Sequence, residues 1–325
     1  MERDYVKEIL EGSDAAVARL ITWLEDEDQR AGPLMERLHP HTGGARIIGI
    51  TGAHGVGKST LTDRLTHKIR QKGLTVGIVA IDPSSPFSGG ALLGDRIRMS
   101  QHNVDPGVYI RSMATRGCLG GTANATADVV KILDASGKDV IIIETVGVGQ
   151  DELDIMDIAD TVCLVLAPGL GDAIQTMKAG ILEIADIYVL NKADRQGTDQ
   201  LHAEICVRIE QDRNIRRNDW TACVVKTAAV DDTGIDDLWK AIIHHGDFLE
   251  NTGRIVERRR DRIQRSLLRM IHNELFRLIR RKLEENGQLD ACVTDILHHV
   301  QEPYGMVRDI LNRWIPADSR QSLNE

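Results

Sequence analysis

The sequence predicts an α/β fold with a mostly parallel β-sheet and additional helices at both ends of the chain. Short runs rich in β-branched residues alternate with longer helix-like stretches between residues 43 and 250, which is typical of a parallel sheet with both faces covered. A glycine-rich loop follows the first run, and only helical patterns occur outside this range. The expected strands are RIIGIT (46–51), VGIVAID (76–82), VYIRSM (108–113), DVIIIET (139–145), TVCLVLA (161–167), DIYVLN (186–191) and TACVVKT (221–227).

Three parts follow from this pattern. Residues 1–42 are predicted to be an N-terminal helical extension, in which Ser13 is a plausible N-cap. Residues 43–250 form the α/β domain, and residues 251–325 form a C-terminal helical arm with helices at 255–285, 289–300 and 304–314. The first of these helices carries an apolar stripe that is too long for a loose tail, which favours a dimerisation arm. Its arginines are expected to form a solvated basic face.

Composition excludes several classes of protein. A net charge of −9 argues against general nucleic-acid binding. The five cysteines are scattered without a C-x-x-C pair, so neither a zinc site nor a disulfide framework is expected. No apolar run reaches the roughly 18 residues of a membrane-spanning helix, and the first twenty residues lack the apolar run of a secretory signal. We therefore expect a cytoplasmic protein with no nucleic-acid and no membrane partner.

The glycine-rich loop provides the strongest functional signal. Residues 52–59, GAHGVGKS, match the G-x-x-x-x-G-K-[ST] pattern between a strand and a helix. The backbone N–H groups of such a loop surround phosphate oxygens, and the helix N-terminus adds positive potential. Lys58 is predicted to reach the β- and γ-phosphates, and Ser59 to bind Mg²⁺. The other predicted phosphate contacts are Gly55, Val56, Gly57 and Thr60.

A second motif indicates which base is bound. Asn191-Lys192-Ala193-Asp194 comes at the end of a strand-like run. The Asp194 carboxylate can accept the N1–H and 2-amino protons of guanine, which adenine lacks. Lys192 would pack its aliphatic stem along the base. Together the two motifs predict a protein that binds GTP and GDP with Mg²⁺.

Acidic residues at other strand ends complete the predicted site. Glu144 lies near the end of the run DVIIIET, where an acid meets the metal in P-loop proteins. Gly147 can bring a backbone N–H close to the γ-phosphate. Val148 stands where a Ras-like protein has a water-orienting glutamine, which predicts weak intrinsic hydrolysis.

A second acidic strand end leads into a possible switch. Asp82 could lie in the outer shell of the metal. The Pro/Ser/Gly-rich segment after it contains Asp95 and Arg98, where a phosphate-sensing switch could close.

Six segments together resemble one family. GAHGVGKST, DPSSPFSGGALLGDRIRM, ATRGCLGG, ETVGVGQDE, APGLGDAIQTMKAGILEIAD and NKAD are similar to those of the methylmalonyl-CoA mutase-associated GTPases, the MeaB/ArgK proteins, whose human counterpart acts in cobalamin A disease. The likeness covers roughly residues 40–250. It implies a homodimeric P-loop GTPase of the SIMIBI class that guards a B12-dependent acyl-CoA mutase and gates its loading with adenosylcobalamin, which the GTPase would meet only through the mutase.

The resemblance also assigns roles by position. It implies catalytic roles for Lys58, Asp95, Arg98 and Glu144, and a metal site of Ser59, Asp82, Asp95 and Glu144. The base-binding residues would be Asn191, Lys192, Asp194, Thr227, Ala228 and Ala229. Asp172, Gln175 and Lys178 fall in the segment known in the family as switch III, a candidate coupling loop to the mutase. The sequence departs from the family at His54, where a proline is usual, and at Ala228, where a serine is usual.

Other functions remain open at this point. A nickel-insertion GTPase shares the SIMIBI core, although such proteins usually carry a His-rich tract or a cysteine pair. A small-molecule kinase would have no need of the guanine motif. A binding module without catalysis accords poorly with intact Lys58, Ser59 and Glu144. The mutase chaperone is the favoured interpretation.

Overall fold

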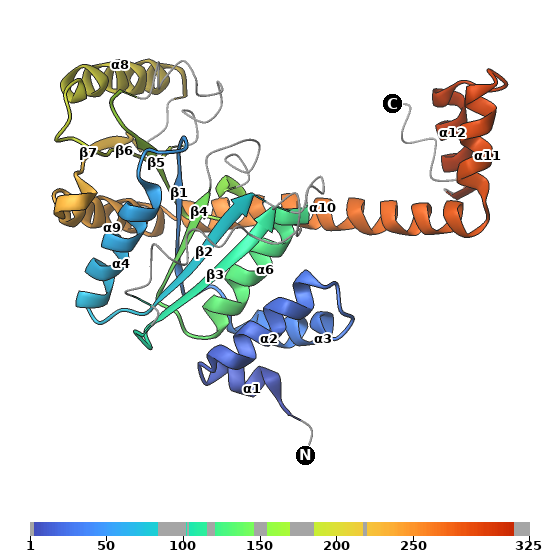
Figure 1. Cartoon of the computed structure of the whole chain (residues 1–325), viewed down its shortest axis with the longest axis horizontal. Helices are drawn as coiled ribbons and strands as arrows, with labels where there is room; N and C mark the ends of the chain where they lie inside the picture. Colours follow the sequence, from blue (N-terminus) through green and yellow to red (C-terminus); the bar gives the residue numbers. More distant parts are fainter. Residues whose placement is uncertain are drawn as a thin grey trace. The chain divides into compact units, whose positions relative to one another are not determined.

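A seven-stranded parallel sheet lies at the centre of the chain (Figure 1). The computed structural model describes residues 3–83, 102, 104–115, 121–145, 155–169, 185–216 and 220–314. Within them the strand order is β3-β2-β4-β1-β5-β6-β7. The strands are β1 (Arg46–Thr51), β2 (Val76–Pro83), β3 (Val108–Thr115), β4 (Val140–Thr145), β5 (Thr161–Leu166), β6 (Ile187–Leu190) and β7 (Cys223–Lys226). The predicted α/β fold with a parallel sheet is confirmed, and each expected run coincides with one strand to within a few residues at its ends.

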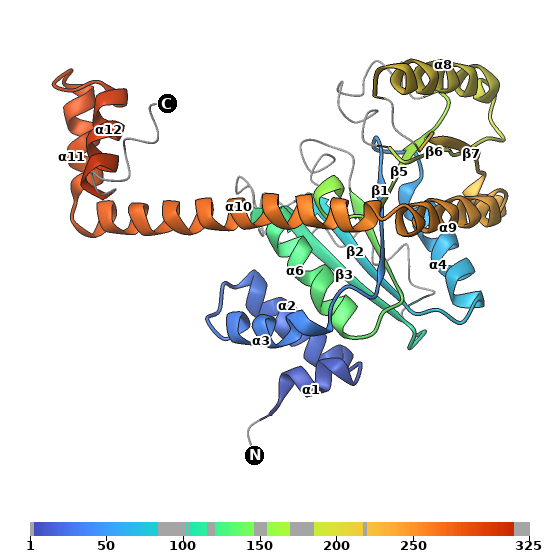
Figure 2. The same ribbon diagram turned by 180° about the vertical axis from the view of Figure 1, so that it is seen from behind.

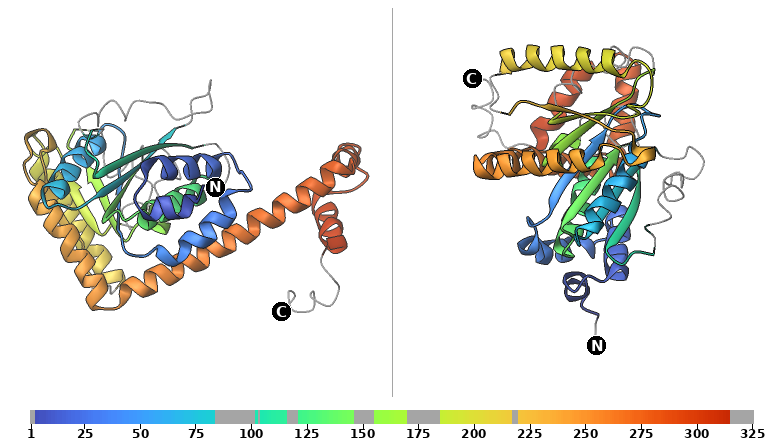
Figure 3. Two further views of the ribbon diagram at one scale, coloured as in Figure 1. Left: turned by 90° about the horizontal axis from the view of Figure 1, so that it is seen from below. Right: turned by 90° about the vertical axis from the view of Figure 1, so that its left-hand side faces the viewer.

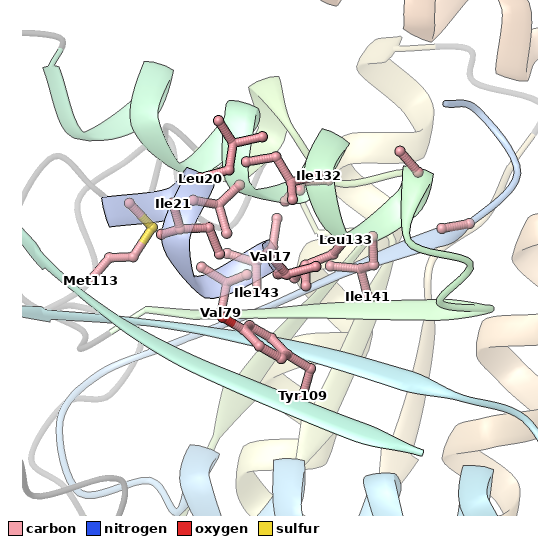
Figure 4. Close-up of a cluster of buried hydrophobic side chains, with 14 of the residues drawn as sticks. Val17, Leu20, Ile21, Val79, Tyr109, Met113, Ile132, Leu133, Ile141 and Ile143 are labelled. Atoms are coloured by element: carbon pink, nitrogen blue, oxygen red, sulfur yellow. The ribbon is translucent and has the colours of Figure 1, made fainter. Parts of the chain in front are cut away.

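Alternate residues of the strands pack on opposite faces of the sheet, as the two-residue repeat of a strand requires. In β4, Val140 and Ile142 join the hydrophobic cluster that includes α4 (Lys58–Gln71) and α9 (Ile235–Asn251). Ile141 and Ile143 join the cluster on the other face, which Figure 4 shows. Both faces of the central strands are therefore buried.

Helices cover the two faces differently. α4 and α9 lie on one face of the sheet (Figure 3), while α6 (Gly121–Ala135) runs along β2, β3 and β4 on the other (Figure 2). α8 (Thr198–Arg216) packs on β5 and β6 through Leu201 and Ile205.

The N-terminal helices extend the α6 face. They are α1 (Tyr5–Leu10), α2 (Asp14–Glu25) and α3 (Ala31–Leu38), and all three contact α6. Ser13 caps α2 as predicted, because its Oγ accepts a hydrogen bond from Ala16 N at 3.4 Å. The buried side chains of α2, among them Val17, Leu20 and Ile21, join the cluster of Figure 4.

The C-terminal part is helical, with α10 (Arg254–Glu285), α11 (Gln288–Leu297) and α12 (Pro303–Trp314). The three predicted helices are thus present. The chain divides into two compact units, residues 1–266 and 267–325, so the division falls inside α10. No helix in the described part of the chain has the length and apolar character needed to cross a membrane.

The first turns of α10 are bound to the amino ends of β5 and β6. Two buried carboxylates, Asp160 and Asp186, directly precede these strands and are 4% and 5% exposed. Arg258 donates to both oxygens of Asp186, at 2.6 and 3.0 Å. Arg262 pairs with Asp160 Oδ1, and Arg259 with Asp160 Oδ2 at 3.2 Å. We call these five residues the amino-edge clamp. The expectation of a solvated basic face is therefore wrong for Arg262, whose side chain is 10% exposed.

His245 of α9 lies beside this clamp. Its Nδ1 is 2.8 Å from Thr161 Oγ1, and its side chain is fully buried. Burial lowers the pKa of His245 to about 4, so the imidazole is neutral near pH 7. The cations that balance the two aspartates are therefore the arginines of α10.

Candidate functional site

The glycine-rich loop connects β1 to α4 at the carboxyl edge of the sheet, and two of its glycines are required by geometry. Gly52 has φ +143°, and a Cβ added there would lie 2.2 Å from Val165 O. Gly57 has φ +96°, and a Cβ there would lie 2.5 Å from Asn191 Nδ2. A side chain at either position would collide with its neighbour, so the loop can lie this close to β5 and Asn191 only with glycine.

Lys58, the first residue of α4, folds back over this loop. Its Nζ donates to Gly52 O at 2.7 Å and to Ala53 O at 3.0 Å, and the residue is 6% exposed. The helix N-cap is Gly57, which has no side chain to bond the first N–H groups of α4. A buried ammonium and a positive helix end thus lie together, and both favour an anion.

Ser59 and Glu144 meet directly. Ser59 Oγ donates to Glu144 Oε1 at 2.6 Å, and Glu144 is 3% exposed. Glu144 pairs with Ile50 across the β1–β4 ladder, so strand alternation places its side chain on the face covered by α4. Hydroxyl and carboxylate oxygens are the ligands that Mg²⁺ prefers. The pair therefore fits the predicted magnesium.

Asn191 joins the glycine-rich loop to the loop after β7. Its Nδ2 donates to Val56 O at 2.9 Å, and its Oδ1 accepts from Thr227 Oγ1 at 3.1 Å and from Ala229 N at 3.2 Å. The residue is 2% exposed. Its amide thus uses donor and acceptor within the protein, which fixes the two loops relative to each other.

The next residues of the same motif face outward. Lys192 has φ +57°, and its Nζ donates to Gly55 O at 2.6 Å. Ala193 N donates to Thr227 O at 2.9 Å. Asp194 is exposed, so its carboxylate is accessible to a ligand.

Several predicted residues are brought to one edge of the sheet. They are the loop residues Gly55, Val56, Gly57, Lys58 and Ser59 with Thr60, Glu144 near the end of β4, Asn191, Lys192 and Asp194 after β6, and Thr227, Ala228 and Ala229 after β7. Ala228 is buried and pairs through its backbone with Thr233. Asp82 is the last but one residue of β2 at the same edge, but its side chain lies outside the described residues. Also outside them are Asp95, Arg98, Gly147, Asp172, Gln175 and Lys178. In the described part of the chain, no group of three or more His, Cys, Asp or Glu could hold a metal.

One buried polar contact at this edge is not predicted by the sequence. Thr145 Oγ1 donates to Thr51 Oγ1 at 2.9 Å, and both residues are buried. The only sequence signal is that threonine ends three of the expected strands, two of which are these.

Comparisons with known proteins agree with this geometry. Residues 17–284 match the family described as methylmalonyl Co-A mutase-associated GTPase MeaB. A relative from Pyrococcus abyssi, named as a GTPase, is 46% identical over 313 residues, covering 96% of both chains. GTPase ArgK of Escherichia coli is 31% identical over 279 residues, or 83% of this chain and 84% of ArgK. A crystal structure described as LAO/AO transport system kinase superposes with a TM-score of 0.68 at 23% identity, covering 94% of this chain and 95% of its own. This last likeness supports the fold alone.

Proposed function

The chain belongs to the MeaB family of methylmalonyl Co-A mutase-associated GTPases, and from this premise we propose that it hydrolyses GTP to gate the loading of adenosylcobalamin into a B12-dependent acyl-CoA mutase. The observation that carries the GTPase part is the contact between Ser59 and Glu144 beside the Lys58 ammonium. These groups supply an anion site and oxygen ligands in one place. The mutase part rests on the family.

The chain's own residues would divide the work of hydrolysis. The N–H groups of residues 55–60 and the Lys58 ammonium would hold the phosphates and offset their charge. Ser59 and Glu144 would hold Mg²⁺, with Asp82 and Asp95 contributing to the same metal. The metal would neutralise charge on the phosphate oxygens. Arg98 would approach the phosphates from its switch, and Gly147 would donate a backbone N–H.

Hydrolysis by the isolated protein is proposed to be slow. Val148 cannot orient a water molecule as a glutamine would. Binding to the mutase would then organise the switch segments and stimulate turnover.

The coupling to the mutase provides a first test. We propose that Asp172, Gln175 and Lys178 contact the mutase in only one nucleotide state. Gln175→Ala and Lys178→Ala should leave GDP affinity and intrinsic hydrolysis nearly unchanged, while mutase-stimulated hydrolysis falls by about tenfold, because about 1.4 kcal/mol of differential contact would be lost. Hydrolysis is measured for each variant with and without the mutase.

Gln200→Ala is the matched control for this test. Gln200 is an exposed residue of α8 whose amide bonds Glu204 at 3.0 Å. It should respond to the mutase as the wild-type protein does. Full stimulation of both coupling variants would show that this segment is not the coupling element.

The second unit supports a proposed homodimer. Large apolar side chains recur along α10 at Leu267, Ile271, Leu275 and Leu278, with exposed fractions between 44% and 55%. Their spacing of three and four residues places them on one helix face. A monomer rarely leaves so continuous an apolar stripe in water.

The dimer is expected to be a two-fold symmetric pair. Light scattering at micromolar concentration should give twice the mass of one chain. Leu275→Glu should yield the mass of one chain, because a carboxylate in an apolar interface costs several kcal/mol. Arg281→Glu, which lies on the same helix, serves as the charge-changing control. A wild-type protein with the mass of one chain would contradict the proposal.

A further inference from the structure

Two threonine hydroxyls link the ends of the two central strands. Thr51 is the last residue of β1, and Thr145 is the last residue of β4. Their Oγ1 atoms lie 2.9 Å apart, and the residues are 0% and 1% exposed. Thr51 directly precedes Gly52 of the glycine-rich loop. Thr145 directly follows Glu144.

The pair lies on the opposite face of the sheet from Glu144. Ile50 and Glu144 are partners in the β1–β4 ladder, and the side chain of Ile50 packs in the cluster that includes α4. One residue further along each strand, the threonines point to the other face. Ile141 and Ile143, which alternate with Glu144 as Thr145 does, are buried in the cluster on that face.

The hydroxyl bridge begins where backbone pairing between these strands stops. The ladder joining β1 to β4 ends at Ile50 and Glu144. On its other side, β4 stays paired with β2 through Thr145. On the β1 side, the hydrogen bond between the two threonine side chains takes the place of backbone pairing, at the residue after Glu144.

Stability alone gives little reason for threonine at both positions. A buried hydroxyl must be taken out of water, and its hydrogen bond restores only part of the loss. Replacing both partners of a buried hydrogen bond by apolar groups of the same shape is often neutral or stabilising. Valine has the shape of threonine, and residues 141–143 of β4 are all isoleucine.

We propose that Thr51 and Thr145 are positioning residues, whose hydroxyl bridge fixes the end of β4 against the start of the glycine-rich loop and thereby holds the Glu144 carboxylate against Ser59. This inference rests on the proposed GTPase function. The bridge restrains the backbone on both sides of the loop. Glu144 and Ser59 can then present their oxygens to Mg²⁺ at a fixed spacing.

The test compares Thr51→Val/Thr145→Val with wild-type protein. Thermal unfolding of the nucleotide-free protein should be unchanged or shifted upward. Mg²⁺ should increase the affinity for GDP, which calorimetry measures. In the double variant, the Mg²⁺ concentration at which half of this increase is reached should be about five- to tenfold higher. kcat should fall by about tenfold with little change in KM, because a slightly misplaced ligand acts on the transition state. Thr145→Ser, which keeps the hydroxyl, should have nearly the wild-type Mg²⁺ dependence of GDP affinity and nearly the wild-type kcat.

Thr126→Val is the matched control, since Thr126 is also fully buried but lies on α6. It should leave the Mg²⁺ dependence unchanged. A double valine variant with wild-type Mg²⁺ dependence and kcat would overturn the inference. So would a loss that follows a fall in the unfolding midpoint, or a Thr145→Ser variant as impaired as the double valine variant. If wild-type protein itself fails to hydrolyse GTP with Mg²⁺, the proposed function fails instead.

Discussion

Replacing Lys58 by alanine is expected to lower kcat/KM for GTP by about 10²–10³-fold or more, since removing one preorganised group that stabilises developing charge has this effect in other enzymes. The ammonium lies inside the glycine-rich loop and is bonded to Gly52 O and Ala53 O. Steady-state hydrolysis assays measure the loss.

The same substitution should change the fold little. Two hydrogen bonds from a charged donor are lost, but the cost of keeping the buried Lys58 ammonium out of water is removed with them. In partial compensation, a cation is removed from the N-terminus of α4, where the helix dipole disfavours it. Thermal unfolding without nucleotide checks this.

Lys68→Ala is the matched control for Lys58→Ala. Lys68 is on the same helix and pairs with Asp236 at 2.5 Å, and the Asp236 side chain is 60% exposed. Its loss should affect neither hydrolysis nor stability measurably, because exposed pairs contribute little. If Lys58→Ala keeps more than a tenth of wild-type kcat/KM, the phosphate role assigned to Lys58 is wrong.

Asp194→Asn should weaken GDP binding by about 10²–10⁴-fold, which corresponds to losing two hydrogen bonds to a charged acceptor at about 1.5–3 kcal/mol each. Guanine offers two donors to the carboxylate. An amide presents one acceptor and one donor, which fits xanthine, so xanthosine diphosphate should bind the variant more tightly than GDP. Calorimetry with the two nucleotides and ADP measures the change.

The structure makes Asp194 a clean position for this test. Its side chain is exposed, while Ala193 before it is fixed to Thr227 O at 2.9 Å. Asp199→Asn is the control, since Asp199 is an exposed carboxylate on α8 that pairs with Lys226 at 2.8 Å. Wild-type protein that binds ADP as tightly as GDP would refute the base assignment.

The strands and the glycine-rich loop could be predicted because their signals are local. Each strand is a short run rich in β-branched residues. Because helices cover both faces of a parallel sheet, the residues on both sides of each strand are apolar and the run is nearly continuous. The loop pattern fixes its own neighbours, a strand before and a helix after. Ser13 was predictable for the same reason, since a cap bonds a residue three positions away.

Contacts between distant parts of the sequence could not be predicted. The helical repeat of α10 does not reveal that Arg258 meets Asp186, 72 residues earlier in the chain. The motif at Asn191 does not reveal that its amide bonds Val56, Thr227 and Ala229. The threonine bridge likewise depends on which strands become neighbours, and the sequence of each strand does not determine the strand order.

The amino-edge clamp sets the shortest length at which the nucleotide-binding part can stand alone. A chain that ends at residue 250 keeps Asp160 and Asp186 but loses Arg258, Arg259 and Arg262. Two carboxylates that are 4% and 5% exposed would then lack their cations, at a cost of about 3–5 kcal/mol each. That cost is comparable to the whole stability of a typical domain, about 5–15 kcal/mol.

Truncation at residue 266 should therefore give a cooperatively folding protein, whereas truncation at residue 250 should give one that melts well below it, as differential scanning calorimetry can show. If the shorter chain melts at the same temperature, the clamp contributes little. The first turns of α10 are therefore expected to stabilise the sheet, although they lie in the arm by sequence. If recombination replaced the arm from its first residue onward, Asp160 and Asp186 would be left buried without their arginines. The arm can therefore be inherited as a separate module only if the break point lies beyond Arg262.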